Sequence, residues 1–406
     1  MAASTLTPGR KINFTPWVII AVILAIVVWR IAYLGSVDPR FNGAYFARAF
    51  IESVKLGSLY ALIALGYTMV YGIIRLINFA HGEVFMVGGF LTYFMFSATP
   101  YPFVAALLFS VAIAFGIMKV LELWRGKLFN DPVTLGAGVV ALAVFTWLLS
   151  SQTLNLLLAL GASMMLTAVV GLLIDRVAYF PLRRAPRNSL LITAIAISFF
   201  LQNFGLLVFT NRQTPFRPDT PLTDQVVLSV GAGQVTTNHL AWAIPVITLV
   251  LVVVLTLFVN RTKIGKAMRA SAQDPEVAQM MGVSVNRIIS TTFLLGCILA
   301  AAGAAMWGLN FGSISQPATK GILPGIKAFS AAVIGGIGSL PGAVVGAMVI
   351  AFLENFLTAI FPAIRTETVD FAGITEFKDT FAFVLLIIIL LVRPSGIMGE
   401  DLSEKV

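Results

Sequence analysis

The polar residues that could do chemistry in this chain are few, and the densest group lies in the segment NFAHGE, residues 78–83. Among apolar runs His81 and Glu83 are costly unless they are hydrogen-bonded or face water. One interpretation is a polar site on a path for a zwitterionic solute. The other is a structural network that caps a broken helix, with Asn78 as N-cap, Glu83 near the positive helix end and Arg75 able to pair with Glu83. Catalysis by His81 and Glu83 is disfavoured, because no nucleophile or metal-ligand set accompanies them.

The chain lacks the residue sets that most cofactors require. It has one cysteine, Cys297, and two histidines, His81 and His239, which excludes an internal disulfide and argues against zinc, haem or iron–sulfur centres. It also lacks the GxxxxGK[ST] pattern of a phosphate-binding loop. We therefore expect no metal, no cofactor and no enzymatic activity, and no binding of ATP by this chain itself.

The composition excludes a soluble enzyme. Of 406 residues, 58% are hydrophobic and only 11% are charged, against roughly 25% charged residues in soluble domains. The mean hydropathy is +0.94. The apolar runs are continuous, whereas the strands of a membrane β-barrel alternate apolar and polar residues. The chain is therefore predicted to be an all-α polytopic membrane protein.

Twelve apolar runs approach the roughly 20 residues that a membrane span needs. They are 17–35, 50–74, 79–96, 102–121, 133–151, 154–174, 190–210, 240–260, 288–308, 323–337, 341–361 and 380–393. Because 79–96 and 323–337 are short or glycine-rich, they could be broken or re-entrant, which leaves about 10–12 transmembrane helices.

No linker divides the chain, so residues 1–406 are predicted to form one transmembrane domain. The run 17–35 could be a cleaved signal peptide. An uncleaved N-terminal anchor is favoured, because the run continues through Trp29 and Tyr33 without a clear small-residue cleavage site.

The positive charges indicate the orientation. Sixteen Lys and Arg residues lie in segments predicted inside and seven in segments predicted outside, which places both termini in the cytoplasm. The same bias explains the net charge of +9 without any nucleic acid.

The loop 261–287 is the most informative inside segment. Its stretch 266–281 is expected to form a surface helix, with Ala267, Ala270, Ala278 and Met281 near one face. Within it, Asp274 is a candidate N-cap, Pro275 can start a helix that runs to Met281, and Gly282 suits its C-terminus. This helix is either an ordinary connection or a docking helix for a cytoplasmic partner.

Glycines and isolated polar residues mark the other candidate positions. Tight helix packing is the favoured interpretation of a glycine series, and broken helices that expose backbone groups are the alternative: Gly335, Gly336, Gly338, Gly342 and Gly346. Gln202 and Asn203 are expected to bond between helices or to line a pathway. Lys327 is a candidate for a gate or a salt bridge.

Several segments, in order along the chain, resemble the LivH-type permeases of branched-chain amino acid ABC importers. GSLYALIALGYTMVYGIIRLINFAHGEVFMVGGF (57–90), DRVAYFPLRRAPRNSLLITAIAISFFLQN (175–203), GKAMRASAQDPEVAQMMGVSVNRII (265–289), GIKAFSAAVIGGIGSLPGAVVGAMVIAFLEN (325–355) and VRPSGIMG (392–399) carry the resemblance. The third block contains Glu276, Ala278 and Gly282 in a pattern similar to Glu-Ala-Ala-x-x-x-Gly, with Val277 in place of the first alanine.

The resemblance implies a permease subunit in a bacterial inner membrane. It implies a heterodimer with a second related permease, two cytoplasmic ABC ATPases that bind ATP, and a periplasmic binding protein. Asp274, Glu276, Ala278 and Gly282 would then couple the chain to the ATPases. Related permeases carry branched-chain or other neutral amino acids, urea or short amides, and the segment 76–88 looks closest to the branched-chain group.

One region departs from the family pattern. Residues 97–155 carry about one extra pair of spans, expected to be a lipid-facing hairpin or, alternatively, a contact to a partner permease. An ion-coupled secondary transporter or channel remains the alternative class, although such proteins usually carry more charged residues within their spans.

Overall fold

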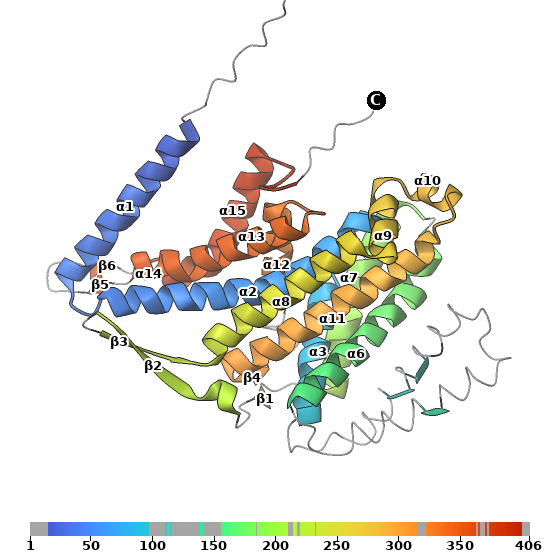
Figure 1. Cartoon of the computed structure of the whole chain (residues 1–406), viewed down its shortest axis with the longest axis horizontal. Coiled ribbons are helices and arrows are strands. Elements are labelled where there is room, and N and C mark those ends of the chain that lie inside the picture. The colour runs from blue at the N-terminus through green and yellow to red at the C-terminus, as the bar shows by residue number, and fades with distance from the viewer. Residues whose placement is uncertain are drawn as a thin grey trace, which may run out of the picture.

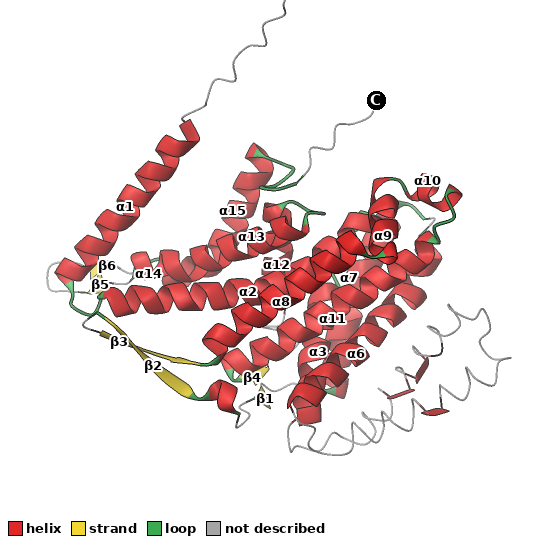
Figure 2. Cartoon of the chain, in the orientation of Figure 1, coloured by secondary structure: helices red, strands yellow, loops and turns green. Residues whose placement is uncertain are grey.

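The chain folds as a bundle of helices, as its computed structural model shows (Figures 1 and 2). The structure describes residues 15–96, 156–183, 185–209, 214–216, 220–231, 233–314, 322–362, 364–365, 370–371 and 373–399, with isolated positions between 110 and 140. The predicted hairpin region 97–155, including its spans 102–121 and 133–151, therefore lies outside the described residues apart from those positions.

Each apolar run that falls on described residues forms a helix close to its predicted bounds. The N-terminal half contains α1 (Thr15–Val37), α2 (Gly43–Ile74), α3 (His81–Phe96), α6 (Leu156–Ile174), α7 (Arg187–Val208) and α8 (Leu240–Arg261). The C-terminal half contains α9 (Lys263–Gln273), α10 (Pro275–Met280), α11 (Val285–Phe311), α12 (Ile322–Gly335), α13 (Leu340–Ala351), α14 (Thr358–Ile360) and α15 (Lys378–Val392).

Shorter elements connect these helices. Two π-helices extend longer ones, η1 (Asp175–Tyr179) after α6 and η4 (Phe352–Leu357) after α13. The 3₁₀ helices are η2 (Phe180–Leu182), η3 (Pro221–Thr223) and η5 (Thr375–Phe377). Strands β2 (Gln225–Val230) and β3 (Gly233–Asn238) form an antiparallel hairpin. Two smaller antiparallel pairs join β1 (Thr214–Pro215) to β4 (Ser313–Ile314) and β5 (Ile364–Arg365) to β6 (Asp370–Phe371).

The prediction of a multi-pass α-helical membrane protein is confirmed. Among the described residues, six helices are long and apolar enough to cross a membrane. They are Gly43–Ile74, Leu156–Leu182, Asn188–Val208, Leu240–Arg261, Val285–Phe311 and Leu340–Ile360. The runs expected to be broken form α3 and α12, of 16 and 14 residues, which is less than the roughly 20 residues of a full span.

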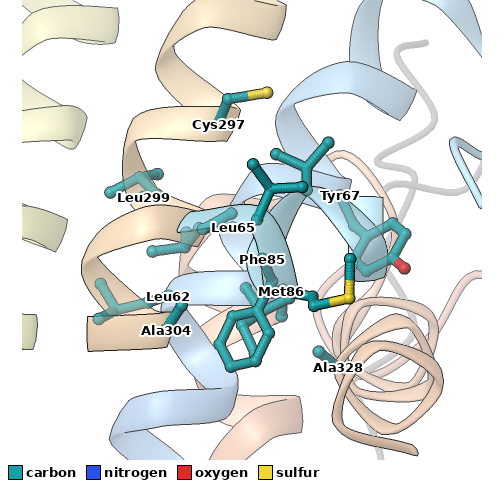
Figure 3. Packing of buried hydrophobic residues seen from close by; sticks show 14 of the residues in the cluster. Leu62, Leu65, Tyr67, Phe85, Met86, Cys297, Leu299, Ala304 and Ala328 are labelled. Atoms are coloured by element: carbon teal, nitrogen blue, oxygen red, sulfur yellow. The ribbon is translucent and has the colours of Figure 1, made fainter. Parts of the chain in front are cut away.

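Helices α2 and α11 form the centre of the bundle. About 78% of the most apolar window of each helix is buried, against 17% for α8. Buried side chains from α2, α3, α11 and α12 pack together in one cluster, which includes Leu62, Phe85, Ala304 and Ala328 (Figure 3). Gly66 of α2 and Gly296 of α11 let the two backbones approach, because a Cβ on Gly66 would lie 3.0 Å from the Gly296 carbonyl oxygen. Small residues at such crossings are how membrane helices associate closely.

The glycine series separates into two groups. A Cβ on Gly335 would lie 1.9 Å from the carbonyl oxygen of Gly342, and one on Gly346 would lie 2.1 Å from that of Ala331, so these three glycines seat α12 against α13. Gly336 and Gly338 instead occupy the turn between the helices with φ of +108° and +99°. Such angles favour glycine, so the turn and not close packing of the two helices explains glycine at position 338.

The bundle has two distinguishable ends. One end carries α9 and α10, and the other carries the β2–β3 hairpin together with the short β5–β6 pair (Figure 1). We refer to them as the α10 end and the hairpin end.

Candidate functional site

The segment between α2 and α3 is a break in the helical path through the bundle. Helix α2 ends at Ile74, and Arg75, its C-cap, adopts a left-handed conformation with φ of 54° and donates its backbone N–H to the Tyr71 carbonyl. Residues 75–80 are not helical, and α3 begins at His81. The predicted broken helix is therefore present.

The residues of the break are held by partners from distant helices, which corrects two expectations. Asn78 does not serve α3 through a side-chain cap: its Oδ1 accepts a hydrogen bond from the Tyr179 hydroxyl at 2.8 Å. Glu83 is not paired with Arg75: its Oε1 accepts a hydrogen bond from Gln202 Nε2 of α7 at 2.8 Å. The local spacing suggested partners within one turn, whereas tertiary packing supplies them across the bundle.

His81 is buried beneath an aromatic ring. It is 1% exposed, and its imidazole lies edge-on to Tyr67 with ring centroids 4.7 Å apart. A Cβ on Gly66 would lie 2.2 Å from His81 Nε2, so the imidazole fills space that the glycine leaves in α2. His81 therefore helps to pack α3 against α2, and no nucleophile accompanies it among the described residues.

A cavity of about 330 Å³ opens beside Glu83. Its polar lining comes from Tyr67, Glu83, Ser198, Gln202 and Ser330. Most of the remaining wall is apolar, including Phe79, Phe329, Phe383 and Leu386. The volume is at the lower end of the 300–1,000 Å³ typical of small-ligand pockets.

Gln202 and Asn203 differ in their hydrogen-bond partners and in their position relative to the cavity. Gln202 lies on the cavity wall and bonds to Glu83, which combines the two roles considered for it. Asn203 is exposed and donates its Nδ2 to the Phe199 carbonyl one turn earlier in α7. Asn203 thus makes neither of the contacts expected of it.

Two clusters of charged side chains flank this region. Near the α10 end, Asp175 of η1 is fully buried, pairs with Arg183 and accepts a hydrogen bond from Ser290 of α11 at 2.6 Å. Arg183 also donates to Asn286 Oδ1 at 2.6 Å. We call Asp175, Arg183 and Ser290 the inner cluster.

The second cluster contains Lys327, whose alternatives were a gate or a salt bridge. Its Nζ lies 2.7 Å from Glu354 Oε1 of η4 and 2.5 Å from Asp379 Oδ1 of α15. The Tyr60 hydroxyl donates to Glu354 Oε2 at 3.0 Å. We call Lys327, Glu354, Asp379 and Tyr60 the outer cluster. Lys327 is thus engaged in a salt bridge that holds α12, η4 and α15 together.

The helix expected from Asp274 and Pro275 forms as α10. Asp274 Oδ1 accepts hydrogen bonds from the backbone N–H groups of Glu276 at 2.9 Å and Val277 at 3.0 Å, which satisfies donors that a helix N-terminus leaves free. Gly282 follows with φ of +85°, in the left-handed region that favours glycine at a helix end.

The rest of the predicted surface helix needs correction. The stretch 266–281 is not continuous, because extended backbone at Asp274 separates α9 from α10. Ala278 and Met281 do not share a buried face, since Ala278 is 4% exposed and Met281 is 80% exposed. Helix α10 therefore presents Val277, Met280 and Met281 outward, and Met280 is 87% exposed.

Several residues of these sites were not singled out from the sequence, among them Asp175, Tyr179, Tyr60 and Asp379. Asp175 had a readable signal, since it ends an apolar run and Arg183 follows eight residues later, about two helical turns. The tyrosines had none, because their partners lie about one hundred or more residues away.

The broken helices, the buried ion pairs and the capped surface helix between two spans define the class of a polytopic membrane transport protein. The model of the family described as branched-chain amino acid transport system / permease component matches residues 50–145 and 133–390. The chain belongs to this family.

The curated relatives agree over most of the chain. It is 36% identical to the high-affinity branched-chain amino acid transport system permease protein BraD of Pseudomonas aeruginosa, over 89% of the chain and 98% of the relative. It is 33% identical to LivH of Escherichia coli K12, over the same shares. A 113-residue stretch is 39% identical to the fructose import permease FrcC of Rhizobium meliloti, covering 26% of the chain and 31% of that protein. No solved structure matches the chain significantly. The branched-chain relatives are permease subunits of transport systems, and this chain is likewise a transport subunit rather than an enzyme.

Proposed function

We propose that the chain is the membrane-spanning subunit of an ABC importer that carries branched-chain amino acids across a bacterial inner membrane. ATP would be bound and hydrolysed by two cytoplasmic ATPase subunits. A second related permease would complete a heterodimer, and a periplasmic binding protein would deliver the amino acid. With both termini in the cytoplasm, the α10 end faces the ATPases and the hairpin end faces the binding protein.

The observation that carries this proposal is the exposed apolar surface of α10. A capped helix that points two methionines into water at the basic end of a membrane bundle is poorly explained as a plain connection. Methionine-rich surfaces adapt well to a partner groove. Asp274 and Gly282 would fix the ends of the docking helix, Ala278 would seat it on the bundle, and Glu276 would lie at its first turn.

Short chain segments and hydrogen bonds together connect α10 to the break between α2 and α3. Helix α11 begins five residues after α10, and its Asn286 and Ser290 contact Arg183 and Asp175. Four residues after Asp175, Tyr179 holds Asn78. In the proposed mechanism, ATPase closure displaces α10, and these contacts pass the displacement to the broken helix beside the cavity.

The docking role is tested with the complete transporter in proteoliposomes. Met280→Glu should reduce both retention of the ATPases during purification and ATP-driven leucine uptake, by about thirtyfold if Met280 is an interface hot spot. Val227→Glu on the β2–β3 hairpin is the matched control for ATPase retention, because Val227 is also exposed, at 56%, and lies at the opposite end.

Gly282→Arg and deletion of residues 274–282 are the stronger perturbations, and both should abolish coupled uptake. Uptake that persists after the deletion would disprove the docking assignment. Uptake of urea or short amides in preference to leucine, isoleucine and valine would instead assign those compounds as the substrate.

A further inference from the structure

The cavity beside Glu83 lies at mid-depth in the bundle. Phe329 and Leu386 on its wall are near the middle of α12 and α15. One side is formed by the start of α3, where the helical path is interrupted. Transport proteins commonly place solute sites at such interrupted helices near the centre of the membrane.

Glu83 lines this cavity and has one buried carboxylate oxygen without a hydrogen-bond partner. The residue is 5% exposed, Oε1 is engaged by Gln202, and Oε2 has no hydrogen-bond partner among the described residues. Gln202 Nε2 is also 3.3 Å from Ser198 Oγ, so two residues of α7 fix the orientation of the carboxylate. A buried carboxylate with a free oxygen is suited to accept hydrogen bonds from a cation.

The remainder of the cavity suits an apolar group. Aromatic side chains of Phe79, Phe329 and Phe383 and the aliphatic Leu386 line it, and Gly82 and Gly325 let α3 and α12 meet at its edge. A Cβ on Gly325 would lie only 2.8 Å from the Gly82 Cα, so no larger residue fits there without a shift. The cavity thus combines one acidic position with an apolar wall.

We propose that this cavity is a transient site for the transported amino acid, in which Glu83 binds the α-ammonium group and the apolar wall receives the branched side chain. The assignment rests on the proposed transport function and adds the substrate position within the permease. Gln202 is the positioning residue that holds the Glu83 carboxylate at the cavity wall through Oε1.

The primary test is Glu83→Gln in the complete transporter with its ATPases, partner permease and binding protein. Glutamine has nearly the same shape and removes the charge. Leucine uptake should fall on the order of thirtyfold, as expected when one partner of a buried charged pair is removed. Retention of the ATPases during purification should be unchanged. Glu52→Gln is the matched control, since it makes the same chemical change in α2 at a side chain that is 40% exposed and does not line the cavity.

The outcome separates this inference from the proposed function. If the wild-type transporter takes up none of leucine, isoleucine and valine, the proposed function fails. If the wild-type transporter works and Glu83→Gln works equally well, only the Glu83 assignment is overturned.

A second variant keeps Glu83 intact and changes the size of the cavity. Ser198→Leu should lower the uptake of leucine and isoleucine about tenfold more than that of alanine, because it fills space needed by a branched side chain. An equal loss for all three substrates would contradict a side-chain site here, whether or not Glu83→Gln folds.

A lipid headgroup could offer the same chemistry, a primary ammonium on an apolar body. The wild-type and Glu83→Gln transporters are therefore compared in vesicles with and without phosphatidylethanolamine. The substrate assignment predicts the same loss in both. A loss confined to vesicles that contain phosphatidylethanolamine would assign Glu83 to the lipid and overturn the proposal.

Discussion

The inner and outer clusters both hold a buried carboxylate, but they differ in their balance of charge. Each centres on a buried carboxylate carried by a π-helix, Asp175 in η1 and Glu354 in η4. A π-helical turn shifts the side chains that follow it around the helix axis, and such turns often occur at functional sites. In both cases the shifted segment delivers an acidic side chain to partners on other helices.

The partners differ in number and sign. Asp175 has one cation, Arg183, and a hydroxyl donor, Ser290, so the inner cluster is electrically balanced. In the outer cluster two carboxylates share one cation, Lys327, and Asp379 has a side chain that is 43% exposed. The outer cluster therefore has a surplus negative charge with access to solvent, and the inner cluster does not.

The difference in charge balance indicates which cluster can tolerate rearrangement. A balanced, fully buried pair loses all compensation when one member moves. A cluster with a solvent-accessible member can exchange a partner for water at a smaller cost. We therefore expect the inner cluster to act as a fixed joint and the outer cluster to permit movement of α12 and α15.

The largest effect is expected from Asp175→Asn. The substitution leaves Arg183, whose side chain is only 12% exposed, without its counter-charge and should cost about 4–5 kcal/mol in the free energy of unfolding. Unfolding in detergent, followed by loss of intrinsic fluorescence, measures the change. If Asp175→Asn lost less stability than the outer-cluster variants, the inner cluster would not be the more rigid of the two.

Lys327→Met should cost less, about 3 kcal/mol, because Tyr60 still donates to Glu354 and Asp379 still reaches solvent. The double variant Lys327→Met/Glu354→Gln should recover most of that loss, since it removes the uncompensated charge and keeps an acceptor for Tyr60. If the losses of the two single variants add up in the double variant, the uncompensated charge of Glu354 is not what destabilises Lys327→Met.

Tyr60→Phe should cost about 1.5 kcal/mol, the value of one hydrogen bond to a charged group. Tyr60 is 1% exposed, so the effect reports on Glu354 and not on solvent contacts. Thermal unfolding in the Glu354→Gln background is the control, and there the effect of Tyr60→Phe should be smaller because the acceptor is neutral.

The sequence predicts the spans well because membrane helices are long, apolar and locally determined. The run 50–74 becomes α2 with seven more residues at its N-terminus, and the run 288–308 becomes α11 with three more residues at each end. The cap at Asp274 is equally local, since its acceptor and donors lie within three residues. Such features need no knowledge of the rest of the molecule.

The candidate site is less predictable because its contacts are distant in sequence. Glu83 meets Gln202 across 119 residues, and Asn78 meets Tyr179 across 101 residues. The π-helical turns that aim Asp175 and Glu354 arise from tertiary packing, so no spacing rule based on the α-helix places them. The outward direction of Met281, which is 80% exposed, likewise depends on how the segment packs on the bundle.

Asp379→Asn should have the smallest effect and is the most discriminating test of the comparison. It removes the surplus charge and makes the outer cluster balanced, with Lys327 and Glu354 paired as Arg183 and Asp175 are. Because Asp379 is partly solvated, we expect a change below about 1 kcal/mol and a weaker dependence of stability on salt. Unfolding midpoints at low and high salt measure both quantities. A loss as large as that of Lys327→Met would mean that Asp379 is the essential partner of Lys327, and the surplus charge would then be structural.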